Sequence, residues 1–266
     1  MKEQINGIEI YYETYGMGEP VVFLNGIMMT VQSWYPQIQF FMKEYKLILH
    51  DFRGQLMSEK PESEYSMEIH AADLKALLDR LGIRKCHIVG TSYGGVVGMI
   101  FSYTYPELVK SLSLIATFSN VSKVTSSHIE SWIEVALKCP GSLYNIATDR
   151  VFSDRFRTEK PEYIEAARTL FKALSYDYFN SFVKLASAAG QVDIPADKIG
   201  NIRCPTLVIA AENDILLPEC SRKIAETIPD SEFVIVPDAG HAVVIEKADV
   251  INTILYGFLS KNKILA

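Results

Sequence analysis

The sequence predicts an α/β fold with a mostly parallel central sheet, an antiparallel hairpin at the N-terminus and an inserted helical cap. Short, almost wholly apolar runs recur along the chain, as strands require when helices cover both faces of a parallel sheet. Segments with helical periodicity separate these runs. In one long middle region the alternation stops, and helical patterns follow one another.

The composition limits what kind of protein this is. The chain has 266 residues, is 48% hydrophobic and 22% charged, and carries a net charge of -6. It can therefore bury a large core as one globular unit. Without a cluster of Lys and Arg, we expect no nucleic-acid partner.

Other sequence features concern location and cofactors. No run approaches the roughly 20 apolar residues of a membrane-spanning helix, and the N-terminus lacks the pattern of an export signal. The 4 cysteines are scattered without metal-type pairs, so reduced thiols are expected. We expect a cytoplasmic protein with no membrane partner, no cofactor and no metal site; a homo-oligomer is compatible with the sequence.

The first predicted element is a hairpin over residues 4–15. Its turn is Asn6-Gly7, because this dipeptide supplies the positive φ angles of a two-residue turn. The clearest predicted helix runs from Ser66 to Gly82, with Glu68 near its start and the glycine as a stop. The remaining strands are predicted at residues 21–25, 46–52, 86–90, 109–116, 206–211 and 232–237.

The middle region, between about residues 118 and 200, contains "SHIESWIEVALK", "PEYIEAARTLFKAL" and "YDYFNSFVKLASAAG". These segments have helical periodicity and no strong strand run lies among them. We therefore predict a helical cap over residues 119–199, inserted into an α/β core of residues 1–118 and 200–266.

A serine lies between glycines where a predicted strand ends, in "IVGTSYGG". Gly90 and Gly94 permit a sharp strand-to-helix turn that lifts Ser92 off the sheet, where a base can reach its hydroxyl. The first amides of the helix would face a developing oxyanion, and Tyr93 N–H is the predicted first donor. A purely structural turn is the alternative; a dinucleotide loop is disfavoured because the G-x-G-x-x-G spacing is absent.

The predicted base and acid follow the last two strands. His241 lies in "VPDAGHAVVIE", in a loop at the expected carboxyl edge of the sheet. Asp214 leaves the preceding strand in "ENDILLP" and would orient the imidazole. The order Ser92, Asp214, His241 suits this architecture. Glu212 and Asp238 remain alternatives for the acid.

Two further groups of site residues are predicted. The second oxyanion donor is expected after the strand at residues 21–25, where Gly26 allows close approach and Ile27 N–H would face the same point as Tyr93 N–H. Aromatic residues of the cap are candidates for an apolar substrate pocket: Trp132, Tyr144, Phe152, Phe171, Tyr178 and Phe182. Helix packing is the alternative explanation for each of these.

With these residues the chain resembles an α/β-hydrolase over nearly its full length. "DFRG" at residues 51–54 resembles the family's loop after the fourth strand, and "RCPTLVIAAENDILLP" and "PDAGHAVVIEKADVINTILYGFL" resemble its acid and histidine segments. "FLNGIMMTVQSW" followed by "HDFRG" is similar to small bacterial esterases and enol-lactonases typified by 3-oxoadipate enol-lactonase. Some family members, such as haloalkane dehalogenases and epoxide hydrolases, use an aspartate nucleophile at this turn. Ser92 at the same position makes those classes less suitable for this chain.

The chain departs from the family pattern at two places. Members often have His-Gly where this chain has Asn25-Gly26, a change that enol-lactonase-like members tolerate. The usual RGxGxS is here Arg53 to Ser58, with Leu56 in place of a glycine. This second change affects the loop that forms part of the expected pocket wall.

The resemblance and the residues together predict a cofactor-independent serine hydrolase that cleaves a small-molecule carboxylic ester or lactone. Ser92 would attack the carbonyl, His241 would transfer the proton and Asp214 would orient the histidine. C–C bond hydrolysis or acyl transfer with the same residues is an alternative. Another is a hydrolase-like ligand sensor that signals through its cap.

Overall fold

One sheet of eight strands forms the centre of the molecule in a computed structural model that describes residues 1–263. The strand order is β1-β2-β4-β3-β5-β6-β7-β8. The strands are β1 (Lys2–Ile5), β2 (Ile8–Tyr15), β3 (Glu19–Leu24), β4 (Tyr45–His50), β5 (Cys86–Thr91), β6 (Val109–Ile115), β7 (Thr206–Ala211) and β8 (Ser231–Val236). Each strand predicted from an apolar run is present, with ends that differ from the predicted ones by at most two residues.

The N-terminal hairpin is antiparallel, as predicted. Asn6 and Gly7 join β1 to β2 and have φ angles of 48° and 82°, which is the combination that a two-residue turn with the twist of the strands requires. β2 also pairs antiparallel with β4, whereas β3 to β8 are parallel neighbours in the sheet. The parallel strands therefore have their carboxyl ends at one common edge.

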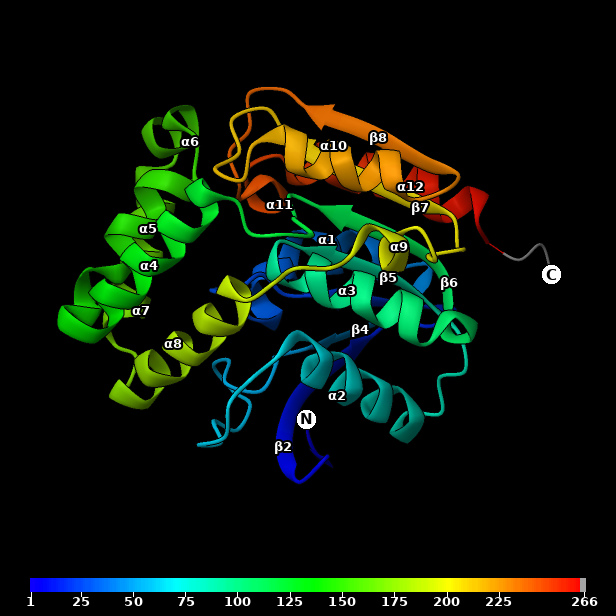
Figure 1. The fold of residues 1–266 in the computed structure, drawn as a ribbon, viewed down its shortest axis with the longest axis horizontal. Coiled ribbons are helices and arrows are strands. Elements are labelled where there is room, and N and C mark those ends of the chain that lie inside the picture. The colour runs from blue at the N-terminus through cyan, green and yellow to red at the C-terminus, as the bar shows by residue number, and fades with distance from the viewer. Residues whose placement is uncertain (264–266) are drawn as a thin grey trace.

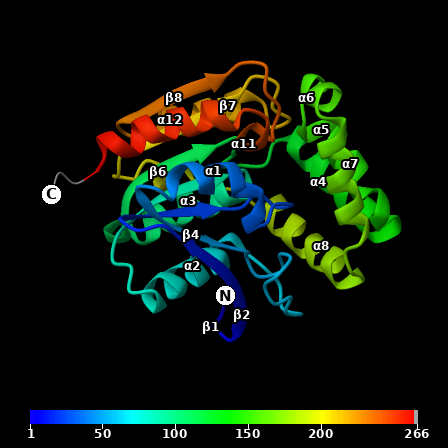
Figure 2. The same cartoon turned by 180° about the vertical axis from the view of Figure 1, so that it is seen from behind.

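Helices cover both faces of the sheet (Figures 1 and 2). One face carries α2 (Met67–Arg80), α3 (Tyr93–Thr104), α9 (Ala196–Ile199) and α10 (Pro218–Thr227); the other carries α1 (Tyr35–Phe41), α11 (Val243–Glu246) and α12 (Ala248–Lys261). Short 3-10 turns lie at Val31–Trp34, Pro106–Leu108 and Pro140–Ser142. Every residue of β5 and β7 is buried, which explains why these strands are mainly apolar rather than alternating.

The predicted helix at residues 66–82 shows how local sequence sets an element's ends. Ser66 caps α2, because its hydroxyl accepts a hydrogen bond of 3.2 Å from the amide of Ile69. Gly82 follows the helix with a φ angle of +68°, a conformation that glycine adopts without a steric cost.

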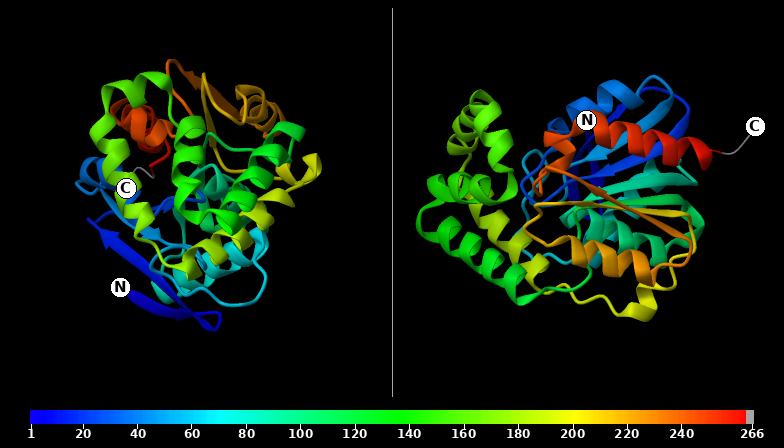
Figure 3. Two further views of the ribbon diagram at one scale, coloured as in Figure 1. Left: turned by 90° about the vertical axis from the view of Figure 1, so that its left-hand side faces the viewer. Right: turned by 90° about the horizontal axis from the view of Figure 1, so that it is seen from above.

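The remaining helices form a group beyond the carboxyl ends of the strands (Figure 3). They are α4 (Lys123–Lys138), α5 (Leu143–Val151), α6 (Asp154–Glu159), α7 (Pro161–Lys172) and α8 (Tyr176–Gly190). The chain enters this group after β6 and returns before β7, and these two strands are adjacent in the sheet. The group is therefore an insertion between neighbouring strands.

Two hydrogen bonds join the chain where it enters and leaves the helical group. Ile194 N–H donates to Ser119 C=O at 2.8 Å, and Val121 N–H donates to Val192 C=O at 3.1 Å. The following helix, α9, packs against α3 and α10 on the sheet side. We keep the division into a core and a cap as a proposal, and these contacts favour an end of the cap near residue 194 rather than 199.

No helix within residues 1–263 is both long enough and apolar enough to cross a bilayer. All four cysteines are free thiols: Cys86, Cys139, Cys204 and Cys220.

Two histidines are completely buried beneath the carboxyl edge of the sheet. His50 ends β4 and packs against Phe52, with 4.9 Å between the ring centroids. His70 lies on α2 and shares a hydrogen bond of 2.7 Å with the phenol of Tyr93. Burial lowers the pKa of His50 to about 4. Burial, followed by the nearby charge of Arg53, lowers the pKa of His70 to about 3.

These buried histidines predict a loss of stability in acid. Both stay neutral in the folded protein, whereas in the unfolded chain they bind a proton as the pH falls through about 6.5. The free energy of unfolding should therefore fall by about 2 kcal/mol per histidine between pH 7 and pH 5. Urea unfolding at both pH values measures this loss. His50→Leu should lose about 2 kcal/mol less than the wild type, and an equal loss in both proteins would contradict the prediction.

Candidate active site

Ser92 forms the first residue of the sharp turn between β5 and α3. Its φ angle is 50°, a strained conformation for a residue with a side chain, with a cost of about 1–3 kcal/mol. A Cβ atom at Gly90 would lie 2.4 Å from the carbonyl oxygen of Gly94, and one at Gly94 would lie 2.3 Å from the carbonyl oxygen of Leu24. Both positions therefore require glycine.

Ser92, His241 and Asp214 lie in one hydrogen-bonded line. His241 Nε2 is 2.9 Å from Ser92 Oγ, and His241 Nδ1 is 2.8 Å from Asp214 Oδ1. An ionised carboxylate can only accept, so Nδ1–H donates to it and Nε2 is left to accept from the hydroxyl. The carboxylate is nearly inaccessible, with 2% of the Asp214 side chain exposed, and it also accepts a bond of 2.8 Å from Leu216 N–H.

The two alternative acids are engaged elsewhere. Glu212 accepts a hydrogen bond of 2.9 Å from the backbone amide of Asp238. The side chain of Asp238 is exposed and lies 4.0 Å from Arg155. Neither carboxylate contacts the imidazole, so Asp214 is the acid that the geometry places beside His241.

Glu246, which the sequence reasoning missed, connects the histidine loop to the cap. Its carboxylate accepts hydrogen bonds from Ser153 N–H at 2.9 Å, from Ser153 Oγ at 2.6 Å and from Gly240 N–H at 3.3 Å. Ala242 N–H donates to Val151 C=O at 2.9 Å. The position of His241 therefore depends on the cap as well as on the sheet. The sequence did not indicate Glu246 because an acid five residues after a histidine forms no recognisable motif.

The two amides predicted as oxyanion donors lie on either side of Ser92. Ile27, Ser92 and Tyr93 all line one small cavity together with His241. Within residues 1–263, neither Ile27 N–H nor Tyr93 N–H donates a hydrogen bond to another group of the protein. Both donors are therefore left for a ligand or water.

Gln55 was also missed, although it bears on the Ile27 amide. Its Nε2 donates to the carbonyl oxygen of Gly26 at 2.9 Å, and Met29 N–H donates to the same oxygen at 3.1 Å. Because a trans peptide is planar, its N–H points away from its C=O. The two bonds to Gly26 C=O thus fix the direction of Ile27 N–H.

The orientation of Gln55 follows from a buried network. The indole of Trp34, which can only donate, donates to Asn25 Oδ1 at 2.9 Å. Asn25 Nδ2 must then donate, and it reaches Gln55 Oε1 at 3.0 Å. Phe52 N–H donates to the same oxygen at 3.0 Å. Only Gln55 Nε2 remains to bind Gly26. Asn25 is the residue that replaces the family's usual histidine.

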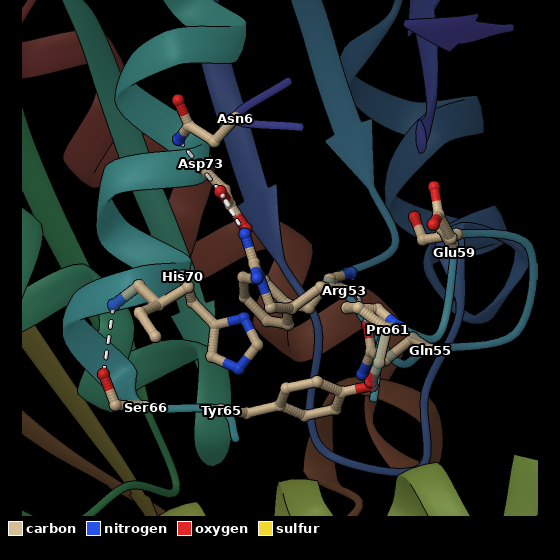
Figure 4. A network of polar contacts seen from close by, with 12 residues as sticks. Asn6, Arg53, Gln55, Glu59, Pro61, Tyr65, Ser66, His70 and Asp73 are labelled. Carbon is tan, nitrogen blue, oxygen red and sulfur yellow. Dashed lines mark hydrogen bonds and ion pairs between the residues drawn. The ribbon is translucent and has the colours of Figure 1, made fainter. Parts of the chain in front are cut away.

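A buried ion pair holds the loop that carries Gln55 (Figure 4). Arg53 binds Asp73 of α2 through Nε at 2.7 Å and Nη2 at 2.9 Å. Asn6 Nδ2 donates to the same carboxylate at 3.0 Å. Tyr65 OH, further along the loop, lies 2.9 Å from Ser181 Oγ on α8 of the cap. The loop is therefore attached to the hairpin, to α2 and to the cap.

A cavity of about 470 Å³ opens beside Ser92 and His241. Five of the six aromatic candidates in the cap line it: Trp132, Tyr144, Phe152, Phe171 and Tyr178. Leu56, the residue in place of a family glycine, lines it too. Phe182, the sixth candidate, is fully buried in the core and does not line the cavity, which agrees with the alternative of helix packing.

A second cavity, of about 40 Å³, lies at the other side of Ser92 and includes His128 of α4. Arg150 donates to His128 Nδ1. Since arginine stays charged, this bond requires a neutral imidazole with its proton on Nε2. Burial and the charge of Arg150 also lower the pKa of His128. No sequence motif marks His128.

Among residues 1–263, no group of three or more His, Cys, Asp or Glu side chains is placed to hold a metal ion.

The fold and this site agree with a known family. The family model described as the alpha/beta hydrolase fold matches residues 19–248. The chain therefore belongs to the α/β hydrolase fold family and is a hydrolase of that fold. The fold class predicted from the sequence is confirmed.

Three known proteins illustrate the relationship. The RutD protein of Azorhizobium caulinodans, which carries the name of a carbamate hydrolase, is 27% identical over 255 residues, and the match covers 94% of each chain. A thermophilic esterase from Thermogutta terrifontis, solved with malate bound, is 27% identical with a TM-score of 0.89, and 99% of each chain is covered. An enol-lactonase from Burkholderia xenovorans LB400 shares the fold, with a TM-score of 0.90 at 23% identity over 98% of this chain and 100% of that one. The predicted resemblance to small esterases and enol-lactonases is confirmed, in the second case as a likeness of fold.

The Arg53–Asp73 pair leads to a prediction about stability. Arg53→Leu would leave Asp73, whose side chain is 2% exposed, without its cation, at a cost of about 3–5 kcal/mol in the free energy of unfolding. Urea unfolding measures the loss. Lys75→Ala, which breaks an exposed pair with Asp79 on the same helix, should cost less than about 1 kcal/mol. Arg53→Leu/Asp73→Leu should recover most of the loss; similar losses in all three variants would contradict the prediction.

Proposed function

We propose that this protein is a serine hydrolase that cleaves a carboxylic ester or lactone through an acyl-enzyme on Ser92. The observation that carries the proposal is the line of hydrogen bonds from Ser92 Oγ through His241 to Asp214, at 2.9 Å and 2.8 Å. A hydroxyl attacks a carbonyl readily only when a base accepts its proton, and an imidazole oriented by a buried carboxylate is such a base.

The first half of the reaction forms the acyl-enzyme. Ser92 Oγ attacks the carbonyl carbon while His241 Nε2 accepts the hydroxyl proton. The carboxylate of Asp214 stabilises the imidazolium and keeps the ring in place. The C–O bond of the tetrahedral intermediate then breaks, and His241 gives its proton to the departing oxygen. In a lactone, this oxygen stays attached to the acyl group through the opened ring.

The second half releases the acid. A water molecule gives a proton to His241 and attacks the acyl carbon, and the bond to Ser92 Oγ breaks as that oxygen recovers the proton. In both halves the negative charge on the carbonyl oxygen is stabilised by the free amides of Ile27 and Tyr93, the latter at the positive end of α3.

Gln55 acts in this proposal as a positioning residue for the oxyanion site. Its Nε2 holds the carbonyl of Gly26, so the attached Ile27 N–H cannot rotate away from the site. A fixed donor stabilises the transition state more than a mobile one, because no energy is spent in reorienting it during the reaction.

The relatives widen the set of substrates to be tested. A carbamate has a carbonyl that the same residues can attack, as do the substrates of C–C bond hydrolysis and of acyl transfer. No particular contact in the site favours these reactions over ester or lactone cleavage. Analysis of products from esters, lactones and carbamates, with water and with alcohol acceptors, separates them. The cytoplasmic location and a homo-oligomeric state remain predictions.

Replacing the nucleophile tests the proposed function directly. Ser92→Ala should lower kcat for ester hydrolysis by at least about 10⁴-fold and should abolish covalent labelling by a fluorophosphonate. Ser33→Ala is the matched control, because Ser33 lines the same cavity but has no histidine partner, and it should keep its labelling. Full activity of folded Ser92→Ala protein would overturn the proposal.

The role of Gln55 is tested by Gln55→Met, which keeps the length of the side chain and removes its amide. We expect kcat to fall by about 10–100-fold with little change in KM, because only the transition state carries the oxyanion charge. Gln37→Met is the control: Gln37 is also buried and donates to a backbone carbonyl, that of Val244, at 3.1 Å. Both variants should lose stability. If kcat falls equally in both, Gln55 has no positioning role.

A further inference from the structure

The two cavities at Ser92 differ greatly in the space that they offer. The larger has a volume of about 470 Å³ and the smaller about 40 Å³. Ile27, Ser92, Trp132 and His241 line both, so the cavities meet at the reacting atoms. At about 30 Å³ per non-hydrogen atom, the larger cavity has space for about 16 atoms of a ligand. The smaller has space for very few, so an acyl chain of any length can be held only in the larger.

The wall of the large cavity carries no formal charge. Among residues 1–263, those that line it include no Asp, Glu, Lys or Arg. Its surface consists mainly of aliphatic, sulfur-containing and aromatic side chains, among them Met28, Leu56, Val151, Phe152, Leu174 and Ile245. An ionised group inside this cavity would lose its hydration without gaining an ion-pair partner.

Three hydroxyl groups of the wall have partners within the protein. Thr148 Oγ1 donates to the carbonyl of Tyr144 at 2.6 Å. Thr30 Oγ1 accepts from Gln32 N–H at 3.1 Å, and Ser33 Oγ accepts from Thr30 N–H at 3.1 Å. The wall also carries the hydroxyl groups of Thr91, Tyr144, Tyr163 and Tyr178, but its surface is mainly apolar. Away from Ser92 the cavity therefore offers chiefly apolar contact.

We propose, on the basis of the proposed function, that the substrate is an ester or lactone with an uncharged, medium-length apolar acyl group, and that its chain occupies the large cavity. The reacting carbonyl lies at Ser92, where the two cavities meet. The chain extends from there between the cap helices and the loop at residues 26–33. Acyl groups that end in a carboxylate are excluded.

The chain-length dependence tests this proposal. p-Nitrophenyl esters from acetate to dodecanoate, used below their micelle concentrations, should show kcat/KM rising about fourfold per methylene. The rise should level off between about six and twelve carbons, when the cavity is full. The p-nitrophenyl monoester of an eight-carbon dicarboxylic acid should react at least about 100-fold more slowly than the octanoate, because its second carboxylate is buried unpaired.

A pair of variants locates the chain. Ala167 of α7 lines the large cavity, whereas its neighbour Ala166 is exposed. Ala167→Leu narrows the cavity, and Ala166→Leu adds the same atoms to the same helix outside it. We expect Ala167→Leu, which adds three carbon atoms to the wall, to shorten the preferred chain by about two or three carbons. The profile of Ala166→Leu should match that of the wild type.

The outcomes separate this inference from the proposed function. If the acetate is the best substrate, or the carboxylate-ended ester reacts as fast as the octanoate, the substrate class is overturned and the serine hydrolase stands. If the Ala166→Leu and Ala167→Leu variants have identical chain-length profiles, the substrate class is also overturned and the serine hydrolase stands. If no ester in the series is hydrolysed and Ser92 is not labelled by a fluorophosphonate, the proposed function fails as well.

Discussion

The close approach of α3 to the end of β3 is the contact on which the site depends. The backbone of Gly94 lies so near to β3 that a Cβ atom there would be 2.3 Å from the carbonyl oxygen of Leu24 and 2.7 Å from that of Asn25. This approach forces the turn at Ser92 and lifts its hydroxyl off the sheet. It also brings the loop that begins at Asn25 beside the first amide of α3. The proposed nucleophile and both proposed oxyanion donors therefore result from one backbone contact.

The polar network behind this contact shows how donors and acceptors can specify a backbone conformation. Trp34 is the starting point, because an indole N–H has no other role than to donate. The orientation of Asn25, then of Gln55, and then of the peptide between Gly26 and Ile27 follows from it. All three side chains are fully or almost fully buried, where an unsatisfied group costs about 1–3 kcal/mol. A flip of any one amide would break several of these bonds together.

The cap contributes both the cavity and part of the support for the histidine. Its helices supply the aromatic wall, and Ser153 shares the carboxylate of Glu246 with the loop that precedes His241. The cap is also joined to the loop after β4 through Tyr65 and Ser181. A movement of the cap would therefore alter the cavity and the position of His241 at the same time. The shape of the cavity and the position of His241 are therefore linked through these contacts.

The sequence by itself determined the order of strands and helices, the hairpin at Asn6-Gly7 and the glycine turn around Ser92. These features depend on apolar periodicity and on local backbone conformation, both of which are written in neighbouring residues. It also indicated Asp214 and His241 through their positions after predicted strands, but it left Glu212 and Asp238 open.

Only the tertiary structure decided which carboxylate lies beside the imidazole, that Gln55 orients the loop at Ile27, and that Phe182 belongs to the core rather than to the cavity. These outcomes depend on contacts between residues that are far apart in the chain. His241 and Ser92, for example, are separated by 149 positions, and no local pattern records the distance or the direction between two such side chains. Gln55 and Glu246 went unrecognised for the same reason, since each acts on a backbone segment that the fold brings to it.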